Sequence, residues 1–122
     1  MVQSVFERCG GFQNVRKVVS DFYDKVLDSE QLQGYFEHID MARLVDHQTK
    51  FVAQIMGGPV TINDDTLRKV HANLGITHSE FKEIAYLLEE ALEDHGFASS
   101  DIAEVVEAVG QRESLIVTRA DD

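Results

Sequence analysis

The helical spacing of apolar residues constrains the fold of this chain more than any other feature. Between Phe12 and Leu27 the apolar side chains recur every three or four residues, which places them along one face of a helix. The same spacing returns in each later segment, and no segment alternates with a period of two residues for long. We therefore expect an all-α fold, and the length of 122 residues suits one domain over 1–122.

Caps and helix breakers predict where these helices begin and end. Asp40 is a good N-cap, Thr77-His78-Ser79-Glu80 has the spacing of a capping box, and glycine pairs stop helices at Gly10-Gly11 and Gly57-Gly58. Ser99 or Ser100 is expected to cap the last helix. The predicted helices span about 2–8, 12–27, 41–56, 65–74, 78–96 and 99–118, with a brief turn at 32–36 and a frayed end at 120–122.

The acidic composition argues against several classes of partner. Asp and Glu number 22 against 11 Lys and Arg, a net charge of −11, whereas proteins that bind nucleic acid normally present a basic face. Anionic membrane surfaces are disfavoured for the same reason, and no apolar run approaches the length of a membrane span. Cys9 is the only cysteine, and we find no secretory signal, so we expect a cytoplasmic protein that binds neutral or buried ligands.

Two histidines interrupt helix faces that are otherwise apolar. In the segment 41–56 the expected inward stripe consists of Leu44, His47, Gln48, Phe51 and Ile55. In the next helix His71 shares the inward face with Leu67, Val70 and Leu74. Buried polar groups are costly unless they have partners, so each face should meet something polar. A neutral imidazole at His71 can give a nitrogen lone pair to a metal while a backbone carbonyl holds its other N–H.

Aromatic residues suit a flat apolar ligand beside these histidines. Tyr23 lies on the inner face of its helix, where its phenol can donate a hydrogen bond to a bound ligand. The aromatic residues that can pack around such a ligand are Phe22, Phe36, Phe51 and Phe81. Each residue also has a simpler interpretation, since a single histidine on an apolar face is more often a satisfied core residue, by roughly three to one. The phenylalanines alone are typical of a core.

Other common site signatures are absent from the sequence. There is no Cys-x-x-Cys pair for zinc, no His-Glu-x-x-His motif and no repeated Glu-x-x-His pair for a di-iron site. The glycine pair at 57–58 follows a helix, so it is no phosphate-binding loop. No serine elbow or nucleophile–base arrangement supports covalent catalysis.

Taken in order, the motifs of this chain resemble those of the truncated hemoglobins, most closely their first group. The motifs are Gly10-Gly11, Phe22-Tyr23-Asp24-Lys25-Val26-Leu27, Tyr35-Phe36, Asp40-Met41-Ala42, His47-Gln48 with Phe51, Gly57-Gly58-Pro59 and Leu67-Arg68-Lys69-Val70-His71. The likeness covers nearly the whole chain. It implies a two-over-two helical sandwich around heme b (iron protoporphyrin IX). The heme should be noncovalent, because there is no Cys-x-x-Cys-His motif and no histidine in 99–118.

The resemblance also implies a role for each candidate residue around the heme. His71 is similar to the proximal iron ligand, Tyr23 and Gln48 to distal hydrogen-bond donors, and Phe36 to the phenylalanine packed against the heme. Leu44 fills the position nearest to where a globin usually has its distal histidine. Phe51 is expected at the heme as well.

His47 and the basic residues have two interpretations each. In relatives with a histidine at this position, it can be a sixth iron ligand, so His47 either ligates the iron or turns outward to a propionate. The sequence favours neither. Basic residues flank the two histidine helices, and Arg68 is expected to meet a propionate; the alternative is that these residues form a solvated face. This basic set is Arg43, Lys50, Arg68 and Lys69.

The implied function is binding of oxygen, nitric oxide or carbon monoxide by a monomer or weak dimer, suited to oxygen transport. Oxygen held by Tyr23 and Gln48 could convert nitric oxide to nitrate, or the heme could transfer electrons; both need an unidentified reductase. The alternative is a heme-based gas or redox sensor in which release of His47 is the switch and the apolar end 115–119 contacts a partner. A helical interaction protein without heme would leave the inward polar residues unexplained.

Overall fold

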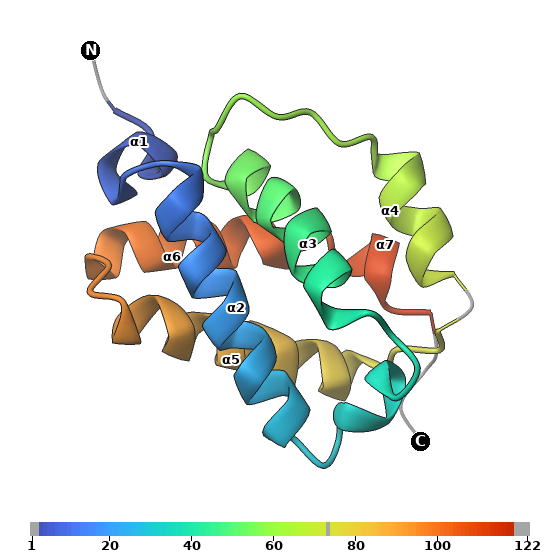
Figure 1. Cartoon of the computed structure of the whole chain (residues 1–122). Coiled ribbons are helices and arrows are strands. Elements are labelled where there is room, and N and C mark those ends of the chain that lie inside the picture. The colour runs from blue at the N-terminus through green and yellow to red at the C-terminus, as the bar shows by residue number, and fades with distance from the viewer. Residues whose placement is uncertain (1–2, 73, 119–122) are drawn as a thin grey trace.

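A computed structural model describes residues 3–72 and 74–118 of the chain, apart from the side chain of Val70, and every regular element in them is helical (Figure 1). The expected all-α fold is confirmed. The elements are α1 (Val5–Cys9), α2 (Phe12–Asp28), the 3-10 helix η1 (Gln33–Phe36), α3 (Met41–Ile55), α4 (Asp64–His71), α5 (His78–Asp94), α6 (Ser99–Gly110) and α7 (Glu113–Ile116). The expected start at Val2, the frayed end at 120–122 and the inward side chain of Val70 lie outside what the structure describes.

Local hydrogen bonds explain most helix starts and correct two expectations. Thr77 and Glu80 form the predicted capping box of α5, and Asp40 accepts the amide of Arg43 at the start of α3. Helix α6 starts after Ala98, whose side chain cannot cap it, so the prediction of a cap by Ser99 or Ser100 was wrong. That helix also ends at Gly110, and α7 begins three residues later, so the single helix predicted over 99–118 is two.

Two pairs of helices form the body of the fold. In Figure 1, α2 and α3 lie together in front of α5 and α6, and α2 contacts both α3 and α5. The core between them is made of small branched side chains without measurable exposure, such as Val15, Val18 and Val19 of α2 and Leu92 of α5. Close packing of such side chains fixes the relative positions of the helices.

Helix α3 has two different apolar faces. The face toward the core consists of Val45, Thr49, Val52 and Ala53, and all four are buried. The stripe predicted to face inward is rotated away from this core: Leu44, Gln48 and Phe51 are only half-buried, and His47 is exposed. Because a helix has about 3.6 residues per turn, two such faces can run side by side along it. The second face of α3 is therefore free to border a ligand.

Helix α4 stands apart from the four main helices. The chain leaves α3 through a turn at Gly57 and Gly58. Helix α1 packs closely against this turn, since a Cβ on Gly58 would lie 2.8 Å from the Phe6 ring. The chain then runs to Asn63, which caps α4, and α4 packs against α7 (Figure 1). This long connection leaves room for a cleft between α3 and α4.

The apolar end of the chain packs onto the core. Ile116 is buried, Leu115 and Val117 are half-buried, and the amide of Thr118 donates to the carbonyl of Ile76 at 2.9 Å. Among the described residues, none of the helices has both the length and the apolar character needed to cross a membrane.

Candidate functional site

A large apolar cavity opens among α2, α3, α4 and α5. It encloses about 1320 Å³, its open mouth included, and most of its lining atoms belong to apolar side chains. The sequence-predicted residues that border it are Phe22, Tyr23, Phe36, Leu44, Gln48, Phe51, Leu67, His71, Leu74 and Phe81. Large cavities with apolar walls and few convergent polar groups are typical of cofactor sites.

The ring of His71 is oriented by a hydrogen bond within its own helix. Its Nδ1 lies 2.8 Å from the carbonyl oxygen of Leu67, one turn earlier in α4. A carbonyl oxygen only accepts hydrogen bonds, so Nδ1 carries the proton and donates it. The lone pair is then on Nε2, and His71 borders the cavity with its ring half-buried. This is the tautomer and the supporting bond that a metal-ligating imidazole needs.

Tyr23 and Gln48 place a hydrogen-bonding pair on the walls formed by α2 and α3. Burial raises the pKa of the Tyr23 phenol well above its ordinary value, and a hydrogen bond with Gln48 opposes part of that shift. The Gln48 carboxamide therefore lies within hydrogen-bonding reach of the phenol. Because its pKa is raised, the phenol keeps its proton through the physiological range and can act as a hydrogen-bond donor at the cavity wall.

Two aromatic contacts hold the Tyr23 ring in place. Phe22 packs edge-on against it at 4.8 Å between ring centroids, and Phe36 does so at 5.9 Å. Edge-to-face pairs at this separation are favourable beyond the apolar area they bury. The phenol thus has little freedom to leave the cavity wall.

A more open groove continues outward from the cavity between α3 and α4. His47, His38 and Arg43 line this groove, and His71 borders both the groove and the inner cavity. His47 is exposed and does not line the inner cavity. Arg68 lines neither space; its guanidinium pairs with Asp65 at 3.0 Å on the outside of α4.

The cavity can take a large apolar group that carries its own metal. Within 3–72 and 74–118, no three His, Cys, Asp or Glu side chains gather to hold a bare metal ion, so His71 would have to share a metal with another ligand set. Ile39 and Leu74 border the cavity with 47% and 41% of their surface exposed, which a bound apolar group would cover. The sequence placed Leu74 on the inward face beside His71, but it did not indicate Ile39 or Ile76, because a rim residue outside a helix has no periodic signal of its own.

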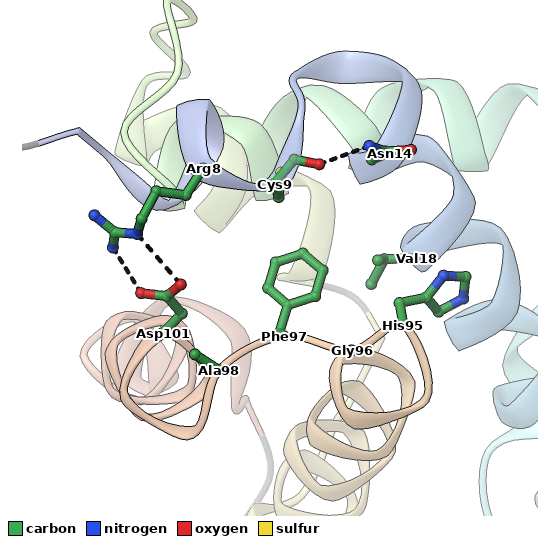
Figure 2. A pocket seen from close by; sticks show the side chains of 9 residues that line it. All are labelled: Arg8, Cys9, Asn14, Val18, His95, Gly96, Phe97, Ala98 and Asp101. Carbon is green, nitrogen blue, oxygen red and sulfur yellow. Dashed lines mark hydrogen bonds and ion pairs between the residues drawn. The ribbon is translucent and has the colours of Figure 1, made fainter.

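A second cavity at the opposite end of α2 is polar (Figure 2). It encloses about 750 Å³, mouth included, between α1, the start of α2 and the turn that leads into α6. Its strongest charges neutralise each other, since Arg8 binds Asp101 at 2.6 Å. The Cys9 thiol lies 3.3 Å from the Phe6 carbonyl oxygen, and Asn14 donates to the Cys9 carbonyl at 2.6 Å. Its charged and polar groups are thus engaged with the protein itself.

Comparison with known proteins gives one consistent result. A family model described as bacterial-like globin matches residues 4–117. The group 1 truncated hemoglobin GlbN of Mycolicibacterium paratuberculosis is 35% identical over 115 residues, which are 94% of this chain and 85% of the relative. The 2/2 hemoglobin of a Synechococcus species, solved in the cyanomet state and with covalently attached heme, is 32% identical with a TM-score of 0.87 and covers 96% of this chain and 100% of its own. The Fe(III) truncated hemoglobin of Tetrahymena pyriformis, at 24% identity and a TM-score of 0.87 over 94% of this chain and 98% of its own, shares the fold.

Proposed function

Because this chain belongs to the bacterial-like globin family, we propose that it holds heme b in the cavity among α2, α3, α4 and α5, with His71 as the proximal iron ligand. The family establishes that heme is the cofactor and that diatomic gases are bound through it. The observation that carries the assignment of His71 is its bond to Leu67, which places the imidazole lone pair on Nε2 of a residue that borders the cavity.

Tyr23 and Gln48 supply the polar side of the gas site. Ferrous heme iron binds oxygen, nitric oxide and carbon monoxide, and oxygen held in a globin can oxidise nitric oxide to nitrate. We assign the Tyr23 hydroxyl as the donor to a polarised ligand, with the Gln48 amide donating to the phenol oxygen and strengthening that bond by polarising it. Leu44 and Phe51 line the same space and keep water away from it.

Nitric oxide dioxygenation is the enzymatic use that this arrangement supports best. An apolar cavity admits neutral gases, and the Tyr23 hydroxyl borders it where it can retain oxygen long enough to meet nitric oxide. Turnover requires a one-electron reductase as partner. Reduced, oxygenated protein mixed with one equivalent of nitric oxide is expected to give about one equivalent of nitrate, measured by ion chromatography. Recovery of the nitric oxide unchanged would rule this activity out and leave gas binding alone.

His47 is proposed as a sixth iron ligand that closes the gas site until it leaves. His47 on α3 and His71 on α4 both border the outer groove, so an imidazole is available from each helix. In the reduced wild type with heme, we expect a six-coordinate low-spin visible spectrum. His47→Ala is expected to convert it fully to the five-coordinate high-spin form, because the competing imidazole is gone.

A matched control separates ligation from a general effect on the groove. His38 lines the same groove and is also exposed, but it is not assigned to the iron. His38→Ala should therefore leave the low-spin spectrum unchanged. A high-spin spectrum in the wild type would show that His47 stays in the groove, where it is free to meet a propionate.

A further inference from the structure

The connection that follows His71 forms hydrogen bonds with other parts of the protein at the end next to α5. Residues 72–77 join α4 to α5, and Leu74 and Ile76 from this connection border the cavity beside His71. Near α5, Ile76 is buried and its carbonyl accepts the amide of Thr118 at 2.9 Å. This end of the connection is thus bonded to the segment that follows α7.

Tyr35 contacts this end of the connection from another wall of the cavity. It lies in η1, between α2, which carries Tyr23, and α3, which carries Gln48, and its ring borders the cavity. Its hydroxyl donates to the Oε1 of Glu80 at 2.7 Å and lies 3.4 Å from the carbonyl oxygen of Gly75. The two bonded residues are 45 positions apart in the sequence, so this is a tertiary contact.

Glu80 turns this contact into a restraint on the connection. Its Oε1 also accepts the backbone amide of Thr77 at 2.9 Å and the Thr77 hydroxyl at 3.2 Å, within the capping box of α5. Tyr35 and Thr77 are thus bound to the same carboxylate oxygen. Hydrogen bonds to a carboxylate are about twice as strong as neutral ones. Thr77 is itself buried, so its groups have little access to water as a substitute partner.

We propose that Tyr35 is a positioning residue for His71. Through Glu80 and Thr77, its hydroxyl would restrain residues 74–77 and so the orientation in which the His71 imidazole would meet the iron. Tyr35 lies in η1, between the helices that carry Tyr23 and Gln48. Its bond to Glu80 therefore links the part of the site with Tyr23 and Gln48 to the part with His71. This inference rests on the proposed ligation of iron by His71.

Tyr35→Phe removes the hydroxyl and keeps the ring in the cavity wall. In the reduced heme-loaded protein, made five-coordinate by His47→Ala if necessary, the iron–imidazole stretching band in resonance Raman is expected to shift and broaden. Carbon monoxide association should change roughly two- to tenfold, as expected for the loss of one hydrogen bond. The control is Tyr86→Phe, since Tyr86 is an exposed tyrosine of α5 outside the cavity, and it should change neither value.

Variants of Glu80 test whether Tyr35 acts through that carboxylate. Glu80→Gln keeps an oxygen that accepts the Tyr35 hydroxyl but loses the charge that strengthens the bond, so its Raman band should lie between those of the wild type and Glu80→Ala. Glu80→Ala removes the acceptor and should shift the band, and adding Tyr35→Phe to it should shift the band no further. Independent, additive shifts from the two residues would overturn the proposal.

Hydrogen exchange separates failure of this inference from failure of the proposed function, because it needs no heme. The amides of Leu74 and Thr77 are bonded to the His71 carbonyl and to Glu80, and both should exchange faster in Tyr35→Phe. Unchanged exchange together with an unchanged Raman band would overturn the role of Tyr35. If the wild type has no iron–imidazole band at all, the ligation by His71 fails, and faster exchange would then show a restraint on the connection alone.

Discussion

Tyr23→Phe is expected to make the reduced protein release oxygen about ten- to a hundredfold faster. Oxygen in a ferrous globin carries partial negative charge, and a hydrogen bond to a charged acceptor contributes about 1.5–3 kcal/mol, where each 1.4 kcal/mol is a factor of ten. The substitution removes the hydroxyl and leaves a ring that still packs between Phe22 and Phe36. Stopped-flow displacement of oxygen by carbon monoxide measures the rate directly.

Carbon monoxide provides the control for this substitution. It is much less polarised than oxygen, so its own dissociation rate should change little when the Tyr23 hydroxyl is removed. An oxygen dissociation rate equal to that of the wild type would remove Tyr23 from the gas site. Equal acceleration of both gases would instead indicate a wider or rearranged cavity.

His71→Gly is expected to have the largest effect on heme binding. Loss of a residue that merely supports a metal ligand lowers metal affinity about 10- to 100-fold, and loss of the ligand itself should exceed that range. The rest of the cavity should persist, because His71 is only half-buried and lies at the last position of α4. Titration with hemin, followed by visible absorption, measures the affinity. His38→Gly, an exposed histidine of the outer groove, should bind hemin as the wild type does.

Much of the fold could be predicted because its signals are local. Thr77 and Glu80 are three residues apart, and their capping box was visible in the sequence as it is in the structure. The break after Gly110 could not be foreseen in the same way. Val109 and Ile116 are seven residues apart, which suits one continuous helix, and both are buried although the helix ends between them. Tertiary packing onto α4 and α5 decides where α7 lies.

The candidate site could be predicted in its residues more than in its geometry. Apolar periodicity cannot distinguish a face toward the core from a face toward a ligand cavity, because both are apolar; α3 has one of each. His47 therefore seemed to lie on an inward face, whereas it is exposed in the outer groove. The bond from Tyr35 to Glu80 had no signal at all, since a half-buried tyrosine in a short turn is typical of an ordinary core.

The visible spectrum of His71→Gly with hemin, before and after imidazole is added, tests the central assignment most directly. If His71 Nε2 is the proximal ligand, the variant should lack the wild-type iron–imidazole spectrum, and free imidazole in the space left by the side chain should restore it. His38→Gly should need no imidazole. A wild-type spectrum in His71→Gly without imidazole would contradict the assignment and show that the iron is held elsewhere in the cavity.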